Sequence, residues 1–382
     1  MRRIAPAPVG HDARLADDGR EFRADAQARG RDCRSSSSVL SVQPPRPAAR
    51  GRREAPACRR GASCIMGAAL RLPRAGCPAL PPAAGSTALP LPAFDSMNLT
   101  THRTGNEIAI TVRRPDTPGP VPVIVLCHGF CGIQEVLLPR FAEAFVAAGY
   151  AAVTFDYRGF GASGGEAGRL VPALQIDDIA TVLAFVKTQA GLDAGRIALW
   201  GTSLGGAHVL AAAAADPAVQ AVVSQLSFAD GEQVVTRNMS GEQRQEFVAM
   251  LERMQEKKAG TGREMFVAIT KVLTDEQSKT FVEAMRQRHP AMDIKIPFLT
   301  VREMLHYKPA EAAARVACPV LVVVAGEDGV NPPEQGVALY DAVASATKAL
   351  HVEAGAGHYD MYDGAHFDHS IARQLAWFAE HV

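Results

Sequence analysis

The sequence predicts an α/β fold with a mostly parallel, eight-stranded sheet and helices on both faces. Strand-like and helical patterns alternate from residue 97 onward, as in parallel α/β proteins. The run 121–127 (VPVIVLC) is continuously apolar, which is typical of a strand buried on both sides. The charged helical segment 229–317 interrupts this alternation and is too long for a loop. We therefore expect it to form a helical cap inserted over the sheet.

The individual elements follow from periodicity and turn signals. Residues 101–115 predict a hairpin that turns at 104–106, because Ile108, Ile110 and Val112 alternate with polar residues. The cap is expected to contain no strand before residue 319. The remaining predicted strands are 121–127, 151–157, 196–200, 221–226, 319–325 and 348–352, and the predicted helices are 136–148, 171–189, one after residue 203, 335–345 and 371–381.

Composition divides the chain into two parts. The chain has 382 residues, 40 Lys and Arg against 40 Asp and Glu, and 47% hydrophobic residues. Residues 1–96 hold 16 Arg, no Lys and 8 acids, which leaves 24 basic and 32 acidic residues for 97–382. The longest apolar run, around Leu210, is broken by Asp216 and Pro217, so we expect no membrane span.

The first 96 residues predict a disordered, Arg/Ala/Pro-rich tail, because large apolar residues are scarce there. A mis-called translation start, with Met97 as the true first residue, is the favoured explanation. A transit peptide or a nucleic-acid-binding tail is weakened by the interspersed acids, so no nucleic-acid partner is expected. The opening segment has no apolar core of a secretory signal, and the seven cysteines show neither zinc-site nor disulfide-scaffold spacing. We expect reduced thiols, a cytoplasmic protein and no metal.

A nucleophile elbow is predicted at residues 201–205. Gly201-Thr202-Ser203-Leu204-Gly205 fits G-x-S-x-G and lies between a buried strand and an Ala-rich helix, the context that this motif requires. Side chains at 201 or 205 would collide with the neighbouring strand or helix. The helix that begins here directs its N–H groups and positive dipole end toward Ser203, which favours an oxyanion at that position.

Polar residues follow the predicted strands at the sheet edge where α/β proteins bind ligands. Ser203, then Glu327 or Asp328, then His358 give a nucleophile, an acid and a base in that chain order. A serine needs an imidazole to remove its proton, and the imidazole needs a carboxylate to orient it. The competing histidines are expected in a strand or on a solvated helix start; they are His351, His366 and His369.

Three other polar residues have alternative interpretations. His128 ends a predicted strand and is expected to be structural, bonding to the backbone so that the following loop presents its N–H groups. His306 and Tyr307 in the cap are expected either to touch substrate or to be packed or solvated.

Five motifs together give a resemblance: HGF (128–130), DYRGFGASGG (156–165), GTSLGG (201–206), GEDGVNPPE (326–334) and GHYDMYDG (357–364). Residues 97–382 resemble a serine α/β-hydrolase, an esterase-like member related to dienelactone hydrolases, serine aminopeptidase-like hydrolases and polyketide transferases. The resemblance implies a catalytic triad of Ser203, Asp328 and His358. Asp328 is favoured because the family places its acid four residues before a proline, although the loop is one residue shorter than usual and leaves Glu327 open.

This resemblance implies hydrolysis of a carboxylic ester or thioester through an acyl-enzyme, with the N–H groups of Phe130 and Leu204 as the oxyanion hole and no cofactor. An acyltransferase using the same triad and a non-catalytic binding module are the alternatives. The expected partner is a small-molecule acyl substrate, and a homodimer is left open. Six apolar cap residues recur near helical spacing, and we expect most of them to pack between cap and sheet and some to line an acyl pocket; they are Phe247, Met250, Leu251, Met254, Phe266 and Phe281.

Overall fold

The computed structural model describes residues 97–382, and the expectations for residues 1–96 lie outside this range. The predicted eight-stranded sheet is confirmed, with strand order β1-β2-β4-β3-β5-β6-β9-β10. β2 pairs antiparallel with β1 and β4, and all other neighbours are parallel. The strands are β1 (Met97–Arg103), β2 (Ala109–Pro115), β3 (Val121–Cys127), β4 (Ala151–Phe155), β5 (Leu192–Thr202), β6 (Val219–Gln225), β9 (Val320–Ala325) and β10 (Lys348–Glu353).

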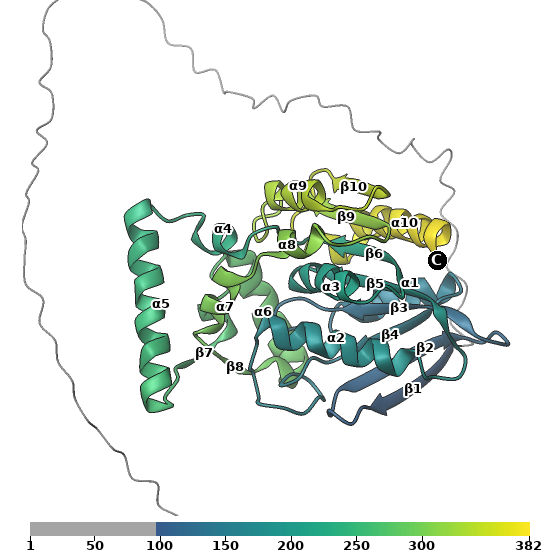
Figure 1. Ribbon diagram of the computed structural model, residues 1–382, viewed down its shortest axis with the longest axis horizontal. Helices are drawn as coiled ribbons and strands as arrows, with labels where there is room; N and C mark the ends of the chain where they lie inside the picture. The colour runs from purple at the N-terminus through teal and green to yellow at the C-terminus, as the bar shows by residue number, and fades with distance from the viewer. Residues whose placement is uncertain (1–96) are drawn as a thin grey trace, which may run out of the picture. The chain divides into compact units, whose positions relative to one another are not determined.

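Helices cover both faces of the sheet, so two hydrophobic cores form (Figure 1). β3 shows why: Val123 and Val125 face one core while Ile124 and Leu126 face the other, and all four are fully buried. One face packs against α2 (Pro172–Val186), α3 (Leu204–Ala215), α8 (Pro309–Ala313) and α9 (Pro333–Ala342), and the other against α1 (Leu138–Ala147) and α10 (Gly364–His381).

The chain segment between β6 and β9 carries the helices that we predict to form a cap (Figure 1). Its longest helix, α5 (Gly241–Thr261), begins at a Ser240 capping box with Gln243 and ends at Gly262, which adopts a left-handed φ of 67°. Leu251 of α5 packs with Val301 and Leu305 of α7 (Thr300–His306). The remaining cap elements are α4 (Gly231–Thr236), η1 (Ile269–Lys271), α6 (Glu276–Arg288) and η2 (Pro290–Met292).

Two expectations about the elements were wrong. The cap contains a small antiparallel sheet of β7 (Phe266–Ala268) and β8 (Lys295–Pro297), whose three-residue strands are too short to give a periodic pattern. The C-terminal helix begins at residue 364, not 371, because the Asp363 side chain caps the N–H of Gly364 and Phe367 extends its buried face. A short 3-10 turn, η3 (Asp360–Tyr362), precedes it.

Candidate active site

Ser203 occupies a sharp corner between β5 and α3. Its backbone has φ 55° and ψ −122°, a region that residues with a side chain rarely adopt. The Ser203 N–H donates to the Gln225 carbonyl of β6 at 2.8 Å, which helps to hold this strained conformation. Strain of this kind costs about 1–3 kcal/mol and is typical of functional sites. The sequence therefore folds Ser203 into the expected elbow.

The two motif glycines are required by close backbone approaches, as the sequence predicts. A Cβ on Gly201 would lie 2.3 Å from the carbonyl oxygen of Gly205 in α3. A Cβ on Gly205 would lie 2.2 Å from the carbonyl oxygen of Cys127, where β3 ends. Neither obstacle is a flexible side chain, so the elbow accepts only glycine at these positions.

Asp328 and His358 form a buried pair at the same edge of the sheet. The carboxylate Oδ2 of Asp328 lies 2.7 Å from Nδ1 of His358, and the two side chains are 1% and 4% exposed. The other oxygen, Oδ1, accepts the N–H groups of Val330 and Asn331 at 2.7 and 2.8 Å. Glu327, the alternative acid, is exposed. The arrangement fixes the His358 ring and leaves its Nε2 for other chemistry.

Both Ser203 and His358 line a cavity of about 60 Å³, together with Tyr359 and Tyr362. Among the hydrogen bonds of residues 97–382, none joins Ser203 Oγ to His358; the one side-chain contact of Oγ is Asn331 Nδ2 at 3.5 Å. Catalytic hydrogen bonds are often long before substrate binds. The cavity that both side chains line places Ser203 and His358 on the same site despite the missing hydrogen bond.

The three competing histidines gather elsewhere, around the carboxylate of Glu353. His351 lies in β10, and His366 and His369 lie in the first part of α10. Their ring nitrogens approach Glu353 at 3.0, 2.9 and 3.4 Å. The contacts with these imidazoles lower the pKa of Glu353, although burial opposes the shift. None of the three lines either cavity that touches Ser203.

Phe130 and Leu204, the predicted oxyanion residues, both lie beside Ser203. Phe130 belongs to the loop after β3, and Leu204 is the first residue of α3. Both line the larger of the two cavities that Ser203 borders, and Phe130 lines the smaller one as well. A helix N-terminus favours negative charge at such a position.

His128 bonds to the backbone, as the sequence predicts. Its Nδ1 lies 3.1 Å from the Gly129 carbonyl, and its ring packs edge-on against Tyr157 at 4.8 Å between centroids. Burial lowers the pKa of His128, so the ring stays neutral. It lies next to the loop that carries Phe130.

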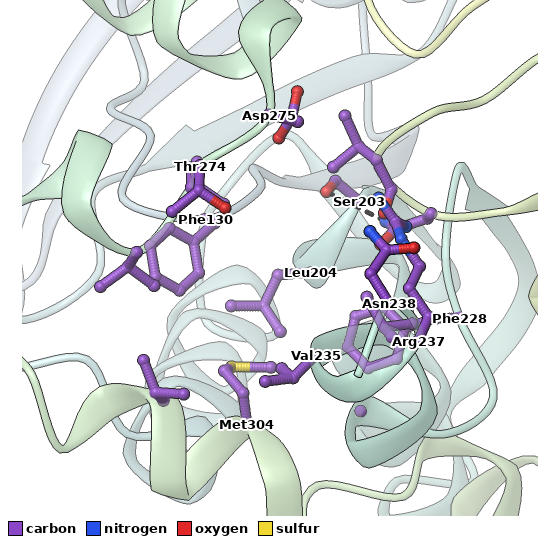
Figure 2. A pocket seen from close by; sticks show the side chains of 17 residues that line it. Phe130, Ser203, Leu204, Phe228, Val235, Arg237, Asn238, Thr274, Asp275 and Met304 are labelled. Carbon is purple, nitrogen blue, oxygen red and sulfur yellow. Dashed lines mark hydrogen bonds between the residues drawn. The ribbon is translucent and has the colours of Figure 1, made fainter. Parts of the chain in front are cut away.

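Figure 2 shows the larger cavity beside Ser203, which has a volume of about 350 Å³. Phe130, Leu204, Val235 and Met304 supply apolar walls, and Arg237, Asn238, Thr274 and Asp275 are polar. Among the six candidate residues, one lines a cavity that Ser203 also lines, which agrees with the expectation that only some of them would. Phe247, Met250 and Leu251 pack within the cap, Met254 is half-buried and Phe266 is 40% exposed, whereas Phe281 lines the smaller cavity and stacks on Tyr359.

The sequence did not single out His208, which is fully buried in α3. Its Nδ1 lies 2.9 Å from the Tyr307 hydroxyl and its Nε2 lies 3.0 Å from Gln175 Oε1. Burial lowers the pKa of His208 to about 3. Of the alternatives given for Tyr307, the structure therefore shows the packed one. His306 is exposed, and its Nε2 lies 3.6 Å from Glu252 Oε1. The one signal in the sequence for the burial of His208 is the run of apolar residues around it.

The cysteines of residues 97–382 carry free thiols that are poor nucleophiles. Burial raises the pKa of Cys318 to about 11 and also raises the pKa of Cys127 and Cys131. Over the same residues, no group of three or more His, Cys, Asp or Glu side chains is arranged to hold a metal ion. No helix in this part of the chain combines the length and apolar character that a membrane crossing needs.

The mostly parallel eight-stranded sheet with helices on both faces defines a protein of the α/β-hydrolase class. A family model described as the alpha/beta hydrolase fold matches residues 122–365, and the chain belongs to this family. The chain is similar to an uncharacterized 31.7 kDa protein in the traX-finO intergenic region of Escherichia coli, with 57% identity over 286 residues, covering 75% of this chain and all of the other.

Two further relatives have names that state an activity. The quorum-quenching protein AidA of Acinetobacter baumannii is 30% identical, covering 69% of this chain and 87% of its own length. The thiohydrolase aneE of Aspergillus aculeatus is 26% identical, covering 66% and 84%. Among solved structures, DcsB in complex with its substrate analogue shares the fold, with a TM-score of 0.65, 24% identity, and coverage of 75% of this chain and 99% of that chain.

Proposed function

We propose that this protein is a serine hydrolase that cleaves a carboxylic ester or thioester through an acyl-enzyme. The observation that carries the proposal is the buried Asp328–His358 pair, which borders the same cavity as the strained Ser203. Glu327 is exposed and does not contact His358, which supports Asp328 as the acid.

In the first half of the reaction, Ser203 Oγ attacks the acyl carbon while its proton passes to Nε2 of His358. The carbonyl oxygen becomes an oxyanion, which accepts hydrogen bonds from the N–H groups of Phe130 and Leu204. Asp328 stabilises the charged imidazole. When the carbon–oxygen or carbon–sulfur bond to the leaving group breaks, the alcohol or thiol takes the proton from His358.

Water completes the cycle in the second half. His358 removes a proton from water, the hydroxide attacks the acyl carbon, and the same proton returns to Ser203 Oγ as the ester bond breaks. The 350 Å³ cavity is at the small end of ligand pockets and has mostly apolar walls. We therefore propose an acyl group of small to medium size.

A fluorophosphonate probe and p-nitrophenyl esters test this function. We expect the probe to label Ser203 in the folded protein, and Ser203→Ala to abolish both labelling and turnover. The matched control is Thr202→Ser, which keeps a hydroxyl beside the nucleophile and should still be labelled. Turnover that survives in Ser203→Ala at more than about a tenth of the parent rate contradicts the assignment, because loss of a nucleophile costs orders of magnitude.

An acyltransferase is the second candidate, because apolar walls around Ser203 would also limit access of water to an acyl-enzyme. The two functions share every step up to the acyl-enzyme and differ only in the acceptor. Trapping the acyl-enzyme and following its decay with and without alcohols or amines distinguishes them. Decay that is no faster with any acceptor than in water alone supports the hydrolase.

A further inference from the structure

Asn331 is the side chain that touches the nucleophile. It lies three residues after Asp328, is 6% exposed and lines the 350 Å³ cavity. Its Nδ2 lies 3.5 Å from Ser203 Oγ and 2.7 Å from the carbonyl oxygen of Leu226. An amide nitrogen carries two hydrogens, so it can donate to both oxygens at once.

The surrounding backbone holds this amide in place. The N–H of Asn331 donates to Asp328 Oδ1 at 2.8 Å, so the carboxylate that orients His358 also fixes the start of Asn331. On the other side, Leu226 has φ 54°, which is unusual for a bulky residue. Its N–H donates to Val323 at 2.7 Å, and its carbonyl accepts from Asn331. The residue with this strained backbone, Leu226, thus supplies the carbonyl oxygen that accepts a hydrogen bond from the Asn331 amide.

We propose that Asn331 is a further catalytic residue, whose side-chain N–H stabilises the negative charge that develops on Ser203 Oγ. The inference rests on the proposed function. As His358 takes the proton from Ser203, charge builds on Oγ before the new bond to carbon is complete. The same oxygen gains charge again when it leaves the acyl group during deacylation, and it then takes the proton back from His358.

The long contact in the resting protein favours this role. A donor–acceptor distance of 3.5 Å is a weak hydrogen bond to a neutral hydroxyl. Hydrogen bonds to charged oxygens are shorter and about twice as strong, so the contact strengthens as charge appears on Oγ. An interaction that is stronger in the transition state than in the ground state raises kcat rather than only lowering KM.

The test compares Asn331→Ala and Asn331→Asp with the parent full-length protein on a p-nitrophenyl ester. Rates are divided by the concentration of active sites, titrated with a fluorophosphonate, so that partly unfolded protein does not count. We expect Asn331→Ala to lower kcat about 10- to 100-fold with KM changed less than about threefold. Asn331→Asp should lose more, because a carboxylate there cannot donate and repels the charge on Oγ.

Ser345→Ala is the matched control for losing a buried polar side chain. Ser345 is 6% exposed, bonds to Thr347 and lies just before β10, at the end of the sheet opposite Ser203. We expect it to lower the melting temperature without changing kcat per active site. The pH dependence of kcat/KM in Asn331→Ala should keep the acid limb of the parent, since the Asp328–His358 contact remains.

Three results overturn the proposal. They are a kcat for Asn331→Ala within twofold of the parent, a rise in KM at unchanged kcat, and failure of both Asn331 variants to fold, which would assign the residue to folding. The Ser203→Ala variant distinguishes a refuted role of Asn331 from a refuted hydrolase mechanism. If Ser203→Ala is inactive while Asn331→Ala is fully active, only the role of Asn331 is refuted; if Ser203→Ala turns over substrate, the hydrolase mechanism fails first.

Discussion

A single added methyl group on Gly129 tests how closely the loop after β3 approaches the nucleophile. A Cβ at this position would lie 3.0 Å from Ser203 Cβ, 3.3 Å from the Thr202 carbonyl and 3.5 Å from Ser203 Oγ. The backbone of Gly129 is not among the positive-φ glycines, so alanine is acceptable in conformation and only the contact is at issue.

The size of the effect follows from these distances. Carbon atoms pack best about 3.5–4.0 Å apart, so Gly129→Ala must move the loop or the elbow by a few tenths of an ångström. Phe130 follows directly, and its N–H is a proposed oxyanion donor. A misplacement of about 1 Å can cost about 100-fold in rate, so for this smaller shift we expect kcat/KM to fall about 3- to 10-fold. Overpacking of this kind costs about 1–3 kcal/mol, so the protein should still fold.

The assay is kcat/KM on a p-nitrophenyl ester, with the melting temperature measured in parallel. Gly105→Ala is the control, because its Cβ would have no neighbour within 4 Å, and it should change neither quantity. Gly205→Ala marks the other extreme, since its Cβ would lie 2.2 Å from a backbone oxygen, and we expect little folded protein. Gly129→Ala at full activity would refute the reasoning that this loop and Ser203 form one rigid unit.

Three further predictions concern the acid, the pocket and a buried histidine. Asp328→Asn should lower kcat by several orders of magnitude while Glu327→Gln changes it less than twofold, measured on the same ester. Met304→Ala should shift the preferred acyl chain to greater length and Phe247→Ala should not, because of these two side chains only Met304 lines the larger cavity; equal profiles for the two variants would contradict this. His208 has a folded pKa of about 3 against 6.5 when unfolded, so the unfolded state binds more protons below pH 6.5 and stability falls with acidification. Between pH 7 and 5 this amounts to about 2 kcal/mol, and urea unfolding of His208→Gln should lack that part of the loss.

The sequence predicts the fold and the order of the polar residues because both depend on local patterns. Buried strands are continuous apolar runs, and each is followed by a short polar loop. Since the carboxyl ends of parallel strands meet at one edge, Ser203, Asp328 and His358 could be grouped without knowing any distance. To choose Asp328 over Glu327, one must know which of the two adjacent side chains points toward His358. The loop is one residue shorter than usual, so the sequence does not show this direction.

The sequence does not predict which residues between 229 and 317 line the larger cavity. Phe247 and Leu251 have helical spacing, but the pattern shows only that a face of α5 is buried and not what it packs against. The larger cavity is instead lined by α4, α7 and the loop before α6, which come together only in three dimensions. Asn331 was missed for a related reason, because an asparagine before two prolines is typical of a turn whether or not its amide reaches a nucleophile.

A buried polar network under the active site joins Ser203 to the loop of His358. Thr202, the residue before the nucleophile, shares a 2.7 Å hydrogen bond with the Tyr362 hydroxyl, and Tyr362 follows His358 by four residues. Gln225 bonds to both Thr202 and Gln374, and Gln374 accepts the indole N–H of Trp200 at 2.6 Å. Buried polar groups are costly unless they are paired, so these hydrogen bonds stabilise the observed arrangement of the side chains. These hydrogen bonds therefore link the segments that carry the proposed nucleophile, Ser203, and the proposed base, His358, although no hydrogen bond of the described residues joins the two side chains.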